Sequence, residues 1–361
     1  MTITTHMIAW DKWVRIAAAL FLGMILYSCS NDLAEGTISG GEQQGKAEIV
    51  FNIQTNASTT RATESHTTTE DGTDKEKAIN SLQVLLYDSS NKFIGKFLAK
   101  SSNTKDTYYG SIAYKQMQSC LDANQKFTGK IMVLANCPQF DGSGDLSNLT
   151  FDYSASSSYN PANENGYIPM WGVISSPDTQ ITQDQTVNFG TINLLRSMAK
   201  IELVPNNGFG TNQASLESAT LNKYNTSGLC VPTGYTTYTS TNEAQQDAFN
   251  IPSSVTTSST SLAFTSSTDG KYIIYIPEMK KEAQSTITLS IKTSTSEAKT
   301  YTVNLGGYSD DGSFSNNYYD IIRNHIYRYN LNLDNEDNIT FTISIKDWVN
   351  SKYATLTPDE D

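Results

Sequence analysis

Apolar residues recur at every second position in many short stretches of this chain, most regularly over residues 46–54, KAEIVFNIQ. There Ile49, Phe51 and Ile53 lie two positions apart. Successive side chains of a β-strand point to opposite faces, so this spacing predicts a strand with one buried face. Residues 55–60 are polar and turn-prone, and we expect the strand to end before them.

Similar patterns predict strands along most of the remaining chain, whereas helical periodicity is nearly absent apart from a short turn expected over residues 115–123. These strands are expected at residues 79–87, 93–99, 108–114, 130–135, 216–224, 271–277, 285–291, 299–305, 323–333 and 338–345. Many short strands at even spacing are typical of all-β sandwiches, and 361 residues exceed one average domain. We therefore predict two consecutive β-sandwich domains, at residues 62–189 and 190–361.

Residues 1–28 have the pattern of a secretory signal peptide. Lys12 and Arg15 supply positive charge, and a short apolar segment over residues 16–27 follows them. The segment ends in Leu-Tyr-Ser-Cys, which resembles the bacterial lipoprotein box and predicts lipid attachment at Cys29. In the alternative interpretation, Cys29 is only the last residue of an ordinary signal peptide.

Composition and charge narrow the class of protein. The formal net charge of -12 argues against nucleic acid or an anionic membrane surface as a partner. Only 17% of residues are charged, and the 20 tyrosines outnumber the 13 phenylalanines. This mixture suits extracellular β-sandwiches, whose strands present Thr and Tyr to water on one face.

The chain carries few residues that could perform catalysis or bind a metal. Of its three histidines, His6 lies in the leader, His66 in a polar loop and His325 on a predicted strand, where packing is the expected role. One histidine cannot complete a catalytic triad or a three-ligand zinc site. We therefore predict a protein that is not an enzyme and that needs neither a cofactor nor a metal.

Three cysteines follow Cys29, namely Cys120, Cys137 and Cys230. An odd number without CxxC spacing does not indicate a disulfide framework or a zinc site. Cys120 and Cys137 could pair in an oxidising compartment, but buried free thiols are an equally good interpretation.

A single arginine, Arg61, interrupts the polar residues after the first strand. Exposed loops with small polar side chains are preferred sites of proteolysis. A cut between Arg61 and Ala62 would detach the strand at residues 46–54, together with any lipid on Cys29, from the rest of the chain. Arg61 could also be an ordinary loop residue.

Several segments, in this order, resemble the fimbrillins, the lipoprotein-derived subunits of type V pili. They are the box that ends at Cys29 with its Gly-rich tether, AEIVFNI followed by an arginine, INSLQVLLYD, VLANCP, LLRSMAKIEL, YIIYIPE, RNHIYRYNL and the late strand that ends in Lys-Asp-Trp. The resemblance extends over nearly the whole chain after the signal peptide.

The resemblance implies two transthyretin-like sandwiches preceded by a removable strand. It implies a precursor that is lipidated on Cys29, reaches the outer membrane, and loses residues 29–61 as a propeptide when an arginine-specific protease cuts after Arg61. The displaced first strand would include Ile49, Phe51 and Ile53. Its loss would leave an apolar groove and unpaired backbone groups, which a strand from a neighbouring subunit could fill.

In the family, the donor strand comes from the C-terminal region, which here corresponds to residues 338–356. The candidate side chains for filling the groove are Ile339, Phe341, Ile343, Ile345 and Trp348. Donation from subunit to subunit would join copies head to tail into a fibre. In the alternative interpretation, residues 338–345 are the last strand of the second sandwich, and only the tail after them can donate.

The resemblance therefore implies a structural subunit of a cell-surface pilus, or fimbrium, with other pilus subunits as partners. Two alternatives stay open. The first is a tip or accessory adhesin of the same pilus that binds a host or microbial surface ligand, which a long mobile loop over residues 139–166 would favour. The second is a surface lipoprotein that does not polymerise and that binds glycans through Tyr and Trp side chains.

Overall fold

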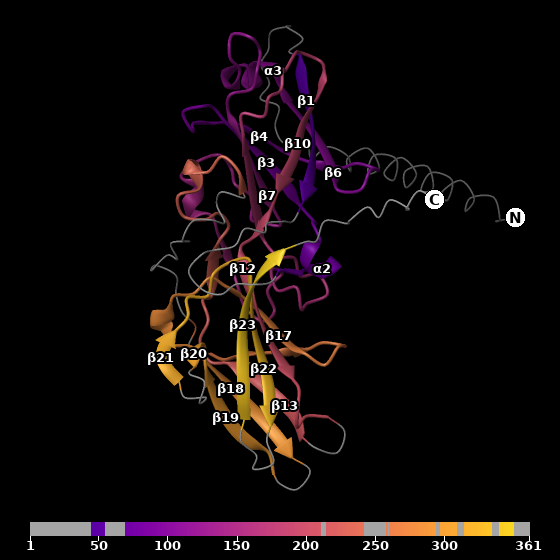
Figure 1. Ribbon diagram of the computed structural model, residues 1–361. Helices are drawn as coiled ribbons and strands as arrows, with labels where there is room; N and C mark the ends of the chain where they lie inside the picture. The colour runs from indigo at the N-terminus through magenta and orange to yellow at the C-terminus, as the bar shows by residue number, and fades with distance from the viewer. Residues whose placement is uncertain are drawn as a thin grey trace, which may run out of the picture. The chain divides into compact units, whose positions relative to one another are not determined.

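The computed structural model describes residues 45–54, 69–210, 214–241, 258, 260–293, 297–308, 314–333 and 339–349 (Figure 1). Contacts divide the chain into residues 1–43 and residues 44–361, and all described residues belong to the second unit. Cys29, Arg61 and Ala62 lie outside the described residues. No helix in the described part of the chain is long and apolar enough to cross a membrane.

Two sheets contain most of the strands before residue 197. They are built from β1 (Lys46–Gln54), β3 (Leu82–Tyr87), β4 (Phe93–Leu98), β5 (Lys100–Ser101), β6 (Thr107–Ala113), β7 (Lys130–Ala135), β9 (Met170–Ser175), β10 (Thr186–Asn193) and β11 (Leu195–Arg196). One sheet has the strand order β10-β1-β6-β5, and the other has the order β11-β9-β7-β3-β4.

Two further sheets contain most of the later strands. They are built from β2 (Thr69–Asp71), β12 (Met198–Pro205), β13 (Ala214–Leu221), β15 (Leu262–Ala263), β16 (Thr265–Ser266), β17 (Tyr272–Pro277), β18 (Thr286–Thr293), β19 (Lys299–Asn304), β22 (His325–Leu333) and β23 (Ile339–Val349). The larger sheet has the order β16-β17-β12-β22-β23-β2, and the smaller has the order β15-β13-β18-β19.

Short elements complete the described fold. Two small sheets pair β14 (Ser227–Leu229) with β8 (Thr150–Asp152) and β20 (Gly306–Tyr308) with β21 (Phe314–Tyr318). The helical segments are α2 (Asp74–Lys77), α3 (Tyr114–Met117) and the 3-10 turns Gln118–Cys120, Leu146–Asn148, Tyr235–Thr237 and Lys281–Ala283.

The structure confirms the predicted all-β fold of sandwich type. Most predicted strands appear within a few residues of their expected limits, and β7 matches its prediction at both ends. The predicted strand at 79–87 begins later, at Leu82, because the Asn136 side chain binds the backbone N–H groups of Asn80 and Ser81. The predicted limit between residues 189 and 190 falls within β10, and the domain limits stay a prediction.

A large apolar core lies between the sheets, and a second, smaller core lies on the other face of the β11-β9-β7-β3-β4 sheet. Val84 and Leu86 of β3 belong to the first core, whereas Leu85 and Tyr87 belong to the second. Phe140, from an irregular segment, and Tyr235, from a 3-10 turn, cover the second core. Because both faces of β3 are covered, all six of its residues are buried, and all except Gln83 are apolar, where a sheet with one exposed face would alternate.

Candidate functional site

The predicted first strand is β1, and it lies in the interior of its sheet between β10 and β6 (Figure 1). It runs parallel to β10 and antiparallel to β6. The parallel pairing contains a β-bulge, because Val50 lies opposite Asn188 whereas Asn52 lies opposite Thr191. The extra residue belongs to β10, where Gly190 has φ of 80°, a value that glycine adopts without strain.

One face of β1 is fully buried. Ala47, Ile49 and Phe51 are 0% exposed, and Ile53 is 6% exposed. The Phe51 ring stacks on Tyr108 of β6, with 6.3 Å between the ring centroids. Burying a large apolar side chain contributes roughly 1.5–3 kcal/mol, so the three large side chains together contribute roughly 5–9 kcal/mol.

Removing β1 would therefore open a specific groove. Backbone N–H and C=O groups of β6 and β10 that now pair with β1 would lose their partners. Core residues beside the strand, among them Val187 and Phe189 of β10 and Ile112 of β6, would lose their cover. The residues predicted to be displaced, Ile49, Phe51 and Ile53, are thus integral to the core, and their displacement stays a prediction.

The predicted donor residues lie on β23, which pairs antiparallel with β22 over nine residues, from Ile339 opposite Leu333 to Asp347 opposite His325. Among the described residues, the other edge of β23 pairs only with the short β2, at residues 347–349. Four of the candidates pack against the core but are only partly buried, namely Ile339, Phe341, Ile343 and Ile345. Residue 338 and residues 350–356 lie outside the described residues.

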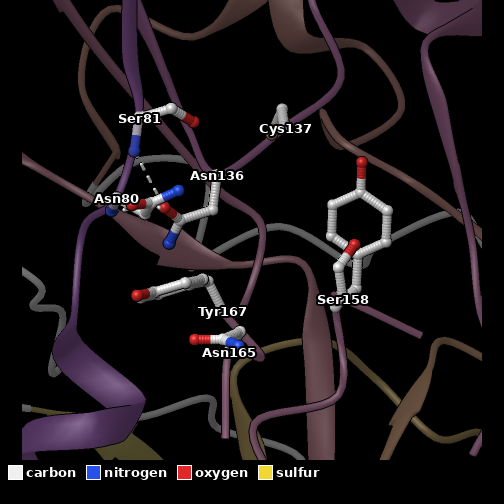
Figure 2. A pocket seen from close by; sticks show the side chains of 8 residues that line it. Asn80, Ser81, Asn136, Cys137, Ser158, Asn165 and Tyr167 are labelled. Carbon is white, nitrogen blue, oxygen red and sulfur yellow. Dashed lines mark hydrogen bonds between the residues drawn. The ribbon is translucent and has the colours of Figure 1, made fainter. Parts of the chain in front are cut away.

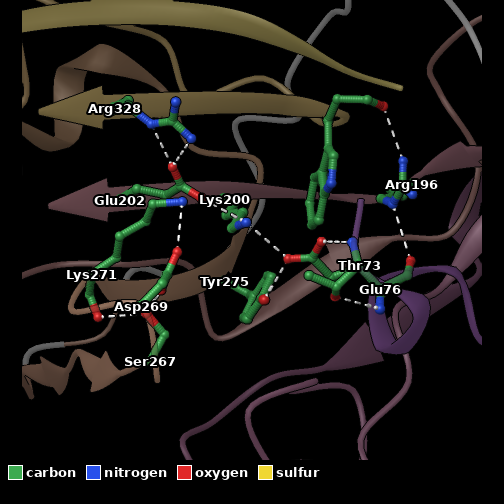
Figure 3. Close-up of polar contacts among 11 residues, drawn as sticks. Thr73, Glu76, Arg196, Lys200, Glu202, Ser267, Asp269, Lys271, Tyr275 and Arg328 are labelled. Carbon is green, nitrogen blue, oxygen red and sulfur yellow. Dashed lines mark hydrogen bonds and ion pairs between the residues drawn. The ribbon is translucent and has the colours of Figure 1, made fainter. Parts of the chain in front are cut away.

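Trp348 differs from these four, because its side chain is 0% exposed. Its ring stacks on Tyr275, with 5.8 Å between centroids, and the Arg196 guanidinium lies 4.5 Å from its centroid. Arg196 also donates to the backbone oxygen of Trp348 at 2.9 Å and to that of Glu76 at 3.1 Å (Figure 3). The end of β23 is thus fastened to the short helix α2.

A buried network of charged residues surrounds this anchor (Figure 3). The Lys200 Nζ lies 3.0 Å from Glu76 Oε1 and 2.6 Å from Glu202 Oε1, and Arg328 Nε donates to Glu202 Oε2 at 2.6 Å. The Tyr275 hydroxyl donates to Glu76 Oε1 at 2.6 Å. Every member of a buried ionic network needs its partners, because removing one leaves another charge uncompensated.

The network sets the charge states of Glu76 and Lys200. Burial opposes the ionisation of Glu76, but the Lys200 charge and the hydrogen bonds from Tyr275 and Thr73 outweigh it, so its pKa lies below 4.5. Burial also disfavours the charged form of Lys200, but Glu76 and Glu202 outweigh that effect and raise its pKa above 10.5. Both groups are therefore charged at neutral pH.

Sequence reasoning did not single out Glu76 or Arg196. A signal for Glu76 was present, because Thr73-Asp-Lys-Glu76 fits a helix capping box, which the structure forms at the start of α2. Arg196 directly follows Leu194 and Leu195 in a largely apolar stretch, a position at which a charged residue indicates a buried partner. The two backbone oxygens that its guanidinium binds lie 120 and 152 residues away, so the sequence pattern could not identify them.

The structure brings some predicted residues together and leaves others apart. The β1 residues share one strand and the donor candidates share another, but β1 and β23 belong to different sheets. Cys120, Cys137 and Cys230 are all free thiols. In the described part of the chain, no group of three His, Cys, Asp or Glu residues is placed to hold a metal ion.

Residues 47–218, from β1 into β13, match the family model of the major fimbrial subunit protein, FimA. That match confirms the resemblance to the fimbrillins. It supports a structural role in a cell-surface pilus, with other pilus subunits as partners. Among curated proteins, none matches this fimbrillin-like chain significantly.

Solved structures share the fold. A candidate cell adhesion protein from Bacteroides eggerthii has a TM-score of 0.50 and 14% identity, over 86% of this chain and 99% of its own length. Another from Parabacteroides distasonis has a TM-score of 0.49 and 16% identity, also over 86% of this chain and 99% of its own length. At 14% identity, the first similarity shows a common fold and nothing beyond it.

Proposed function

We propose that this chain is a structural subunit of a cell-surface pilus and that it polymerises by strand exchange after cleavage. The precursor is lipidated on Cys29 and held at the outer membrane until an arginine-specific protease cuts between Arg61 and Ala62. The observation that carries the proposal is the position of β1, the first described strand, which lies in the interior of a sheet with one face buried.

The free energy contributed by burying the β1 side chains supports replacement of β1 by another strand over its simple loss. Native domains are stable by about 5–15 kcal/mol, which is comparable to the roughly 5–9 kcal/mol attributed to the three large side chains of β1. A subunit without β1 therefore needs a replacement strand. The replacement adds backbone pairing along both open edges and places side chains in the groove.

The apolar spacing of β23 supports it as the donor, and in the precursor this strand still pairs with β22 in its own sheet. Its apolar side chains at 339, 341, 343 and 345 have the two-residue spacing of those at 47, 49, 51 and 53. They are partly buried in their own sheet, whereas the corresponding β1 positions are almost fully buried. Moving β23 into a neighbour's groove would thus increase the burial of these side chains, at the cost of its pairing with β22 and of the Trp348 anchor.

The variant Arg61→Ala tests the cleavage step. We expect it to keep the first strand attached, so surface extracts should contain a lipidated monomer. Wild-type protein should instead begin at Ala62 and form a ladder of multimers that collapses on boiling. Mass spectrometry of the N-terminus and electrophoresis after mild denaturation measure both properties.

Arg61→Lys is the matched control, because it keeps the positive charge but removes the arginine. It should behave like Arg61→Ala with an arginine-specific protease. A wild-type N-terminus at Cys29, or a normal ladder from Arg61→Ala, would show that cleavage at this position is not the trigger.

An adhesin role in the same pilus is a second candidate. It is favoured by a polar pocket lined in part by the irregular segment within residues 139–166 and by no residue of β1 or β23.

A further inference from the structure

A pocket of about 420 Å³ lies next to the start of β3 and the end of β7. It is lined by Asn80, Ser81, Asn136, Cys137, Ser158, Tyr159, Asn165 and Tyr167 (Figure 2). Its volume lies within the range of about 300–1,000 Å³ typical of small-molecule sites. None of these residues belongs to β1, β6 or β10, so the pocket is separate from the proposed strand-exchange groove.

Asn136 builds one wall of the pocket. Its Oδ1 accepts hydrogen bonds from the backbone N–H groups of Asn80 at 2.8 Å and Ser81 at 3.3 Å. Its Nδ2 donates to the backbone oxygens of Ala78 and Ile168, both at 2.9 Å. The Asn136 side chain is therefore fully engaged and positions its neighbours; Figure 2 shows it between Ser81 and Tyr167.

The opposite wall is a loop fixed by its own hydrogen bonds. Tyr167 N donates to Ser158 O at 2.9 Å, and Asn163 Nδ2 donates to Ser157 O at 2.9 Å. Gly166 approaches Asn160 so closely that a Cβ would lie 1.7 Å from its backbone oxygen, so only glycine fits there. The pocket wall is thus formed before any ligand arrives, which lowers the entropic cost of binding.

The groups that line the pocket have unused hydrogen-bonding capacity. In the described part of the chain, no hydrogen bond is made by the hydroxyls of Ser81, Ser158, Tyr159 and Tyr167 or by the carboxamides of Asn80 and Asn165. Hydroxyls and carboxamides both donate and accept. No acidic or basic side chain lines the pocket.

We propose that this pocket binds a neutral carbohydrate, of about one or two sugar units, through Asn80, Ser158, Asn165 and the two tyrosines. The hydroxyls of a sugar both donate and accept, which matches the unused groups. The uncharged lining offers no ion pair to an acidic or basic ligand. Tyrosine rings provide apolar faces against which the C–H groups of a sugar ring can pack.

An array of neutral and acidic oligosaccharides, probed with the folded precursor, tests this proposal. We expect binding to neutral sugars only. Tyr167→Ala combined with Asn165→Ala should raise the dissociation constant for the sugar roughly tenfold or more. Tyr167→Phe should raise it less, because the ring remains. Tyr301→Ala is the matched control, because this tyrosine lies on β19, outside the pocket and outside the strands that pair with β1.

Thermal unfolding of each variant establishes that it is folded. No binding to any neutral sugar, binding that the double variant leaves unchanged, or equal loss in Tyr301→Ala would overturn the proposal. The electrophoretic ladder is measured on the same variants, because strand exchange does not need the pocket. An intact ladder without sugar binding would refute the carbohydrate site alone, whereas sugar binding without a ladder would refute polymerisation alone.

Discussion

At the scale of single residues, Glu76 connects the start of α2 with the larger C-terminal sheet. Its carboxylate contacts Lys200 and Tyr275, and its backbone oxygen accepts from Arg196, which in turn holds Trp348. A side chain that follows the proposed cleavage loop therefore helps to hold the last described strand.

We predict that Glu76→Gln lowers the free energy of unfolding at neutral pH by about 3 kcal/mol, because Lys200 stays buried with less compensating charge. The folded-state pKa of Glu76 lies below 4.5, so its stabilisation is fully present above that pH. As the pH falls towards the folded-state pKa, the unfolded chain binds more protons than the folded chain does. The stabilisation by Glu76 therefore disappears as the pH falls through that pKa.

Urea unfolding at several pH values between about 3 and 7 measures this effect. The variant should lose the part of the pH dependence that Glu76 contributes. Asp178→Asn is the control, because it breaks an ion pair with Lys126 at the surface, where such pairs contribute little. Equal acid sensitivity in wild type and Glu76→Gln would contradict the role of the ion pair.

At the scale of elements, β23 offers two adjacent positions that face opposite ways. Ile343 packs against the core, and Thr342 is exposed. We predict that Ile343→Asp abolishes the multimer ladder, since a charge cannot enter an apolar groove, whereas Thr342→Asp preserves it.

Circular dichroism and thermal unfolding of both precursors show whether each subunit still folds. The informative comparison uses wild-type subunits without β1, which can accept a strand, mixed with each variant as donor. Equal multimer formation by the two variants would contradict donation by β23 in this register.

An element can be predicted from the sequence where the interactions that form it involve neighbouring residues, and cannot where they involve segments far along the chain. Strand β1 was predictable because one face is buried and its alternation is visible within nine residues. The two-sided burial of β3 and the Asn136 hydrogen bonds depend on segments far along the chain, so the late start of β3 was not predictable. The loop that forms the pocket wall looked only polar, because its order comes from side-chain bonds to its own backbone.

At the scale of the whole molecule, the proposal predicts a large difference in stability between precursor and mature monomer. A chain that starts at Ala62 should unfold at a markedly lower temperature than the precursor and should bind a dye that reports exposed apolar surface. A synthetic peptide of residues 46–54 added in excess should restore the higher unfolding temperature, because it refills the groove.

A peptide with Ile49 and Phe51 both changed to Asp is the control, and it should not restore stability. Calorimetry and dye fluorescence follow the recovery. A mature monomer as stable as the precursor, or rescue by the control peptide, would show that β1 does not occupy an essential groove.

The extra residue in β10 has a consequence for the fibre as a whole. It belongs to the accepting strand, so it stays with the subunit when β1 leaves. An incoming strand meets this kink at one fixed point, and a slip by one residue would turn its apolar side chains to the solvent. Every junction would then lock at the same offset. A bulge at the same position in every accepting subunit would give the filament a constant axial repeat, however many subunits join it.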